Sequence, residues 1–126
     1  SAEAAPAPPP VGSVRPQLDP VPALDMPPQF CSAEERNRFH DTRYVPTVKI
    51  ADANNKAAIS HLDALQAQYD AKVRDRDINA ANAIAADAAA FRPVADQAYA
   101  ARIALLGQFD RMMAVAIAPC QTTAAK

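Results

Sequence analysis

The two cysteines of the chain, Cys31 and Cys120, are the residues whose chemistry the sequence constrains most. They bracket almost all of the sequence that can form a core, and an alanine-rich helical pattern lies between them. The most polar segment of that pattern, residues 74–77, falls almost midway. A reversal of the chain there brings the two thiols together at one end. The spacing therefore predicts a disulfide between Cys31 and Cys120 that clamps a helical hairpin.

Such a bridge has consequences for stability and for the cellular compartment. On the chain-entropy model, a loop of about 90 residues gives roughly 4–5 kcal/mol of stabilisation. Disulfides persist outside the cytosol, and the opening run Ser1-Ala2-Glu3 resembles a start just after signal-peptidase cleavage. We therefore expect an exported protein, periplasmic or extracellular. Catalytic dithiols usually have the spacing Cys-x-x-Cys, so redox catalysis is disfavoured.

The remaining soft ligands do not form a metal motif. On a helix, ligands that share a face are three or four residues apart. Neither His40 nor His61 has a cysteine, an acidic residue or a second histidine at those spacings, and the adjacent Met112 and Met113 point to different faces and are typical of core filling. The sequence indicates no metal and no cofactor.

The patterns that accompany catalysis are also missing from the sequence. With Gly12 and Gly107 as the two glycines, a phosphate-cradling loop is excluded, and no nucleophile stands beside a base. Four acidic residues have basic partners four positions away, as on a solvated helix; these pairs are Glu34–Arg38, Asp52–Lys56, Asp70–Arg74 and Arg92–Asp96. We expect a protein that is not an enzyme.

Composition limits the classes of partner. The net charge is -1 and the 13 basic residues are dispersed, which argues against nucleic acid binding. No apolar run approaches the ~18 residues that a membrane span needs. Half of the residues are hydrophobic, but alanine supplies much of that fraction and tryptophan is absent. Helices of this composition bury little area each and must pack closely or find a partner.

Proline divides the chain into three predicted parts. Most of the 12 prolines lie in residues 1–29, which favours an extended arm or tether over helix or sheet. Residues 30–120 form the predicted α-helical hairpin domain, and residues 121–126 a C-terminal tail. The arm carries spaced apolar residues with which it can lie along a surface; these are Val11, Val14, Leu18, Val21, Leu24 and Met26.

Local signals set the helix ends. Ser32 and Glu35 form a capping box, with Phe30 as a staple against the stem of Arg36 or against Phe39. Pro46 predicts a kink or a short break in the first helix. Asp77 is a fair N-cap for the second helix. Pro93 does not shift the apolar phase, so it favours a kinked continuous helix, and Pro119 ends that helix.

Apolar spacing gives two stripes of unequal clarity. The stripe of the first helix consists of Val45, Val48, Asp52, Asn55, Ile59, Leu62, Gln66, Tyr69 and Val73. Three of these positions are polar. Either they line a hydrated seam, or the apolar face of the helix drifts toward Ala58 and Leu65. The stripe of the second helix alternates strictly by three and four; its members are Ala81, Ile84, Ala88, Phe91, Ala95, Ala98, Arg102, Leu105, Phe109, Met112 and Ala116. Beside it runs a second apolar row, which consists of Tyr99, Ile103, Leu106, Met113 and Ile117.

A lone two-helix hairpin cannot bury both rows of the second helix, and exposed apolar rows mark interaction surfaces. The expected fold is all-α: a long helical hairpin or small helical bundle, clamped by a disulfide, with an extended Pro-rich N-terminal arm. The expected function is a non-catalytic structural or accessory subunit, an adaptor in an exported complex of the bacterial envelope or a homo-oligomer. The predicted contact residues are Phe91, Tyr99, Ile103, Leu106, Phe109 and Met113, although Phe91 and Phe109 also suit the core. The alternative is a periplasmic chaperone or a small helical protein that binds hydrophobic ligands.

Overall fold

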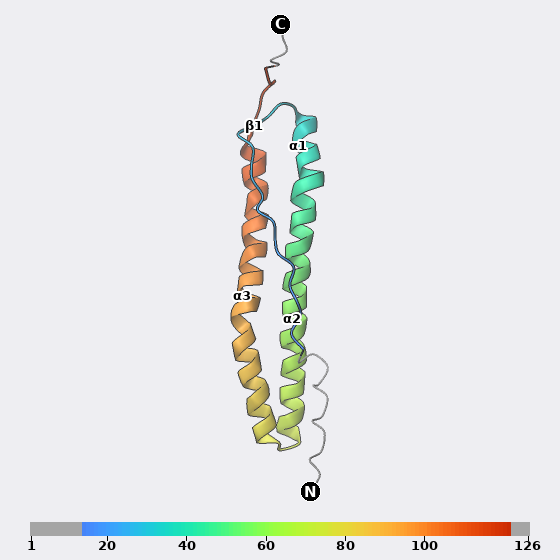
Figure 1. Ribbon diagram of the computed structural model, residues 1–126, viewed down its shortest axis with the longest axis vertical. Coiled ribbons are helices and arrows are strands. Elements are labelled where there is room, and N and C mark those ends of the chain that lie inside the picture. Colours follow the sequence, from blue (N-terminus) through green and yellow to red (C-terminus); the bar gives the residue numbers. More distant parts are fainter. Residues whose placement is uncertain (1–13, 122–126) are drawn as a thin grey trace. The chain divides into compact units, whose positions relative to one another are not determined.

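The computed structural model describes residues 14–121, so the first part of the predicted arm and residues 122–126 of the tail lie outside the described range. The described chain is mostly helical, with two long helices, as predicted. The elements in order are β1 (Gln29–Phe30), α1 (Ala33–Phe39), the π-helix η1 (His40–Tyr44), α2 (Val45–Arg74), α3 (Ile78–Ala114) and β2 (Ala116–Ile117) (Figure 1). No helix in the range 14–121 is long and apolar enough to cross a membrane.

The chain divides into two compact units, and each contains part of α2 and part of α3. Within the described range, the first unit consists of residues 14–18 and Asn55–Gln97. The second unit consists of Asp19–Asn54 and residues 98–121. The predicted arm therefore contributes to both units.

The first unit contains the predicted reversal. Helix α2 ends at Arg74 and α3 begins at Ile78, and Arg76 adopts a left-handed conformation with φ of 58°. The amide of Asp77 bonds to the carbonyl of Lys72 at 2.9 Å, which satisfies a carbonyl of the last turn of α2. The Asp77 carboxylate accepts from the amide of Ala80 at 3.2 Å. Asp77 is therefore the N-cap of α3, as predicted.

The second unit contains the capped start of α1. Ser32 Oγ accepts from the amide of Glu35 at 3.1 Å, as the capping box predicts. Glu35 Oε2 accepts from the amide of Cys31 at 2.8 Å, one residue earlier than the box requires. The rings of Phe30 and Phe39 lie 5.5 Å apart. Of the two predicted staple partners of Phe30, the structure thus places Phe39 in ring contact.

Pro46 does not break the helix. The helical run continues from α1 through η1 into α2, and the amide of Val45 bonds to the carbonyl of His40, five residues earlier. Proline has no amide hydrogen to donate, and a π-turn just before it re-spaces the backbone bonds. The hydroxyl of Thr47 also donates to the carbonyl of Arg43 at 2.7 Å. The predicted break is therefore wrong, and a π-turn accommodates Pro46 within a continuous helical run.

The buried face of α2 lies one residue before the stripe that the sequence suggested. Its members are small or polar more often than large and apolar: Thr47, Ala51 and Asn54 in the second unit, and Ala58, His61 and Leu65 in the first. Tyr44 of η1 continues the same face. Ile59 and Val73, which belonged to the predicted stripe, are exposed. The drift toward Ala58 and Leu65 is thus the correct alternative.

The stripe of α3 is largely as predicted, and Pro93 lies inside one continuous helix. Its buried members are Ala81 and Phe91 in the first unit and Ala98, Leu105 and Met112 in the second. Phe109 departs from the stripe because 40% of it is exposed. Ala116 lies in β2 and is exposed, because α3 ends at Ala114 and not at Pro119 as predicted. Buried alanines recur on both helices, and their short side chains let helix backbones approach closely.

The core of the second unit forms around Phe30, Tyr44 and Met112, with Leu24 and Met26 of the arm packed against it. Strands β1 and β2 form a short parallel pair that the all-α prediction did not include, with Phe30 opposite Ile117. The amide of Ala118 adds a bond to the carbonyl of Phe30 at 2.9 Å. These backbone bonds hold the segment before α1 against the segment after α3.

Candidate interaction surface

Cys31 and Cys120 lie in the second unit and form a disulfide, with their Cα atoms 4.9 Å apart. Both residues adjoin the β1–β2 pair, so the backbone bonds there already bring the two cysteines together. Cys120 is exposed, and the side-chain amide of Gln29 lies 3.5 Å from its sulfur. The pairing matches the prediction from the spacing of the cysteines.

Glu35 joins these cysteines in a cluster whose ligand atoms all lie within 4.8 Å of one another. Two thiolates and a carboxylate are zinc ligands in proteins. Here the two sulfur atoms are bonded to each other, and Glu35 already accepts the amide of Cys31. With the disulfide formed, these three residues therefore have a structural role: Glu35 caps the start of α1, and the disulfide ties that start to Cys120. The sequence did not indicate that Glu35 and Cys120 would meet.

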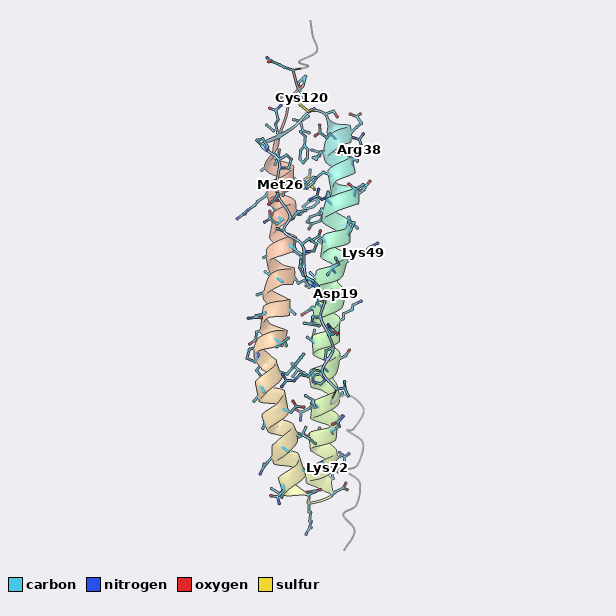
Figure 2. All side chains as sticks on the ribbon, in the orientation of Figure 1. Asp19, Met26, Arg38, Lys49, Lys72 and Cys120 are labelled. Carbon is cyan, nitrogen blue, oxygen red and sulfur yellow. A yellow bond between two sulfur atoms is a disulfide. The ribbon has the colours of Figure 1, made fainter. Side chains whose placement is uncertain are left out.

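The arm is attached to α2 through its backbone. Asn54 is buried, and its Oδ1 accepts from the amide of Asp19 at 2.9 Å while its Nδ2 donates to the carbonyl of Asp19 at 2.8 Å. The Asp19 side chain takes no part in either bond (Figure 2 labels Asp19 on the arm). A buried asparagine satisfied in this way fixes the position of the arm along the helix.

A second attachment of the arm lies in the first unit. Arg15 Nη2 is 3.3 Å from Asp87 Oδ1, and the Arg15 guanidinium lies 5.8 Å from the ring centroid of Phe91. The ring of His61 meets Phe91 edge-on at 4.5 Å. Among residues 14–121, no group forms a hydrogen bond with the buried His61 Nε2, so the ring acts mainly through packing. Arginine over an aromatic face is a favourable contact of about 0.5–1 kcal/mol.

Three rings gather where η1 meets α3 in the second unit. Phe109 lies 5.9 Å from Tyr44 and 6.2 Å from His40, and His40 stacks on Tyr44 at 5.5 Å. Burial raises the pKa of Tyr44 above its ordinary value of 10.0, and the carboxylates of Asp110 and Asp52 raise it further. Phe109 therefore has one side in this cluster and another toward solvent.

An apolar surface runs along α3 in the second unit, and we call it the α3 row: Tyr99, Ile103, Leu106 and Met113. The exposed fractions of these residues range from 40% for Leu106 to 56% for Tyr99. Ile117 of β2, the last member of the predicted second row, is exposed as well. Large apolar side chains this exposed, aligned on one helix face, are typical of a surface that binds another protein.

The six predicted contact residues separate into three groups. The members of the α3 row are exposed, as a contact surface requires. Phe109 is half exposed and also belongs to the ring cluster with Tyr44. Phe91 is 1% exposed and lies in the first unit between Arg15 and His61, so it is a core residue and not a contact residue.

Two of the four ion pairs predicted within single helices have other partners in the structure. Asp52 binds Arg102 Nε at 2.6 Å and thus links α2 to α3 within the second unit, in place of the predicted pair with Lys56. Asp70 accepts from Gln66 at 3.0 Å in place of Arg74. Both groups of the Arg102–Asp52 pair are more than a third exposed, so solvent screening keeps its contribution small.

Comparison with known proteins returned no match of the chain to a protein-family model, to a curated protein or to a solved structure.

Proposed function

We propose that the chain is a non-catalytic structural or accessory subunit, an adaptor in an exported complex of the bacterial envelope. The α3 row is the observation that carries this proposal. Four large apolar side chains stay 40–56% exposed along one helix face, although the same helix buries Leu105 and Met112 almost completely. Full burial of an exposed side chain of this size is worth roughly 1.5–3 kcal/mol, and these half-exposed side chains would gain about half of that on burial by a partner.

The arm supports an adaptor role in this proposal, since residues 14–28 contain neither helix nor strand and make side-chain contacts with the helices. Asn54 and Arg15 hold it at two points, one in each unit. Proline-rich segments serve as extended recognition elements because little conformational entropy is lost when they bind. The arm is therefore the second binding element of the proposal.

The cysteine pair supports the compartment in this proposal. A disulfide that closes most of a small chain is typical of the periplasm or the extracellular space. An exposed sulfur at Cys120 would meet reductants in the cytosol. We therefore place the proposed complex in an oxidising compartment.

The experiment is capture of the tagged chain from its native envelope, with matched variants on α3. Leu106→Asp places a charge in the α3 row, and Ala104→Asp places the same charge on an exposed position of the same helix off the row. We expect a stoichiometric partner with the wild type and with Ala104→Asp, and loss of that partner with Leu106→Asp. Equal capture by both variants, with helicity retained, would contradict the proposal.

A groove in the first unit favours a second candidate function, binding of a small hydrophobic ligand. Its lining is mixed, with Asp63, Gln66 and Arg92 as polar members; the apolar lining includes Leu62, Leu65, Tyr69, Ile84 and Ala88. Concave apolar surfaces with a few polar groups are typical of ligand sites. An Ala88→Phe variant fills this groove and should abolish binding of a fluorescent apolar probe, while Ala83→Phe, on an exposed position outside the groove, should not.

A further inference from the structure

We propose that the α3 row binds the same row of a second copy of this chain, with the two helices antiparallel. This inference rests on the proposed function only in taking the α3 row as a binding surface. Tyr99, Ile103 and Leu106 are separated by four and then three residues, and Met113 follows seven residues after Leu106. This is the spacing of a coiled-coil seam, which is complementary to a helix with the same spacing.

Asp110 determines the relative direction of the two helices. It occupies the position that completes the spacing between Leu106 and Met113, and within residues 14–121 it makes no hydrogen bond or ion pair. In a parallel pair, Asp110 would face Asp110 of the second copy across the seam, which repels. An antiparallel pair places Asp110 opposite a different residue and avoids that contact.

Charge complementarity selects the register. When Ile103 faces Leu106 of the second copy, Tyr99 faces Asp110 of the second copy, and the symmetry repeats both contacts. A helical side chain leans toward the N-terminus of its helix, so Arg102 covers the level of Tyr99. Arg102 uses Nε to bind Asp52, which leaves its two terminal NH₂ groups free to donate to a second carboxylate. The Tyr99 hydroxyl supplies a further donor to Asp110.

Small residues beside the α3 row permit close approach. Ala100, Gly107 and Ala114 flank it at spacings of seven, and all three are exposed. Apart from its own stretch of helix, a Cβ added at Gly107 would meet no atom of residues 14–121 within 4 Å, so this position is open to an approaching helix. Helix pairs with small residues at the contact reach the short end of the interaxial range, near 8 Å.

Sedimentation of the purified, disulfide-bonded chain tests the pairing. We expect a monomer–dimer equilibrium that Leu106→Asp weakens roughly 30-fold or more, because this residue is central in the seam. Ala104→Asp is the matched control and should leave the equilibrium within about threefold. A monomer at all concentrations would overturn this inference. It would not overturn the proposed function, because the capture experiment separately tests whether a different partner binds the α3 row.

A charge-pair variant tests the register. Ile103→Lys and Leu106→Asp should each weaken the dimer. The two changes in one chain should restore at least about tenfold of the affinity, because the introduced lysine then faces the introduced aspartate of the second copy. Losses that simply add would contradict the contact between these positions.

Cysteine cross-linking gives an independent measurement of the same register. A mixture of Ile103→Cys and Leu106→Cys chains should cross-link faster than either variant alone, with the native disulfide intact. Equal or faster self-linking of Leu106→Cys would contradict the proposed register.

Discussion

The side-chain amide of Asn54 binds both backbone groups of Asp19, as acceptor to its N–H at 2.9 Å and as donor to its C=O at 2.8 Å. The two residues are 35 positions apart, and one belongs to the arm and the other to the buried face of α2. These two bonds attach the arm to α2. They use only the backbone of Asp19, so they do not depend on its side chain.

Removal of the Asn54 amide should release this part of the arm. We expect Asn54→Ala to weaken its docking by roughly 1–2 kcal/mol, the value of two ordinary hydrogen bonds in a partly wet site. Faster hydrogen exchange at the amide of Asp19 is the measurement. Asp19→Ala is the control, and it should leave the exchange of that amide nearly unchanged because only the Asp19 backbone is bound. A large effect of Asp19→Ala would show that the side chain matters instead.

The disulfide should supply a large share of the stability. Replacement of Cys31 and Cys120 by serine removes the cross-link of a loop with a sequence separation of 89, worth roughly 4 kcal/mol on the chain-entropy model. Urea unfolding followed by circular dichroism is the measurement. The β1–β2 pair and the Phe30 contacts persist in the variant, so helicity at low urea should be retained. An unchanged midpoint would contradict the role of the clamp.

Two aromatic residues of α3 should differ sharply in their contribution to stability. Phe91 is 1% exposed, so Phe91→Ala should cost about 3–5 kcal/mol of the free energy of unfolding. Tyr99 is largely exposed, and Tyr99→Ala should cost no more than about 0.5 kcal/mol in dilute, monomeric protein. Chemical denaturation of both variants is the measurement, and similar losses would contradict the assignment of Phe91 to the core and Tyr99 to the surface.

Tyr44 should make the fold sensitive to alkaline pH. Its folded pKa is raised, so the native state holds the phenolic proton more tightly than the unfolded state does. This contribution is fully present below pH 10.0 and is lost as pH rises through the folded pKa. The free energy of unfolding should therefore fall more steeply above pH 10 in the wild type than in Tyr44→Phe. Parallel pH profiles would contradict this account.

The sequence was sufficient for features set by neighbouring residues. Ser32 and Asp77 cap their helices as predicted, since a cap depends on residues within one turn. The α3 stripe could also be predicted, because large apolar residues such as Leu105 and Met112 mark its buried face. The cysteine pair followed from the symmetric position of the reversal.

Features that depend on distant partners escaped the sequence reasoning. Asn54, Thr47 and His61 lie on the buried face of α2, but as polar residues they gave no apolar signal, while the exposed Ile59 did. Asn54 is buried because the backbone of Asp19 satisfies it. The π-turn before Pro46 is a further example. Proline removes one backbone hydrogen bond, from which we predicted a kink or break, but the π-turn keeps the helical run continuous.

The measurement that tests the central claim most directly is the rate of oxidation of two adjacent methionines in the assembled protein and in dilute monomer. Met112 is 1% exposed and Met113, in the α3 row, is 47% exposed. Peroxide should oxidise Met113 rapidly and Met112 slowly in the monomer, because conversion to the sulfoxide requires access to the sulfur. If the α3 row is a binding surface, assembly should slow the oxidation of Met113 to the rate of Met112. Equal oxidation of Met113 in both states, with Met112 still protected, would contradict the claim.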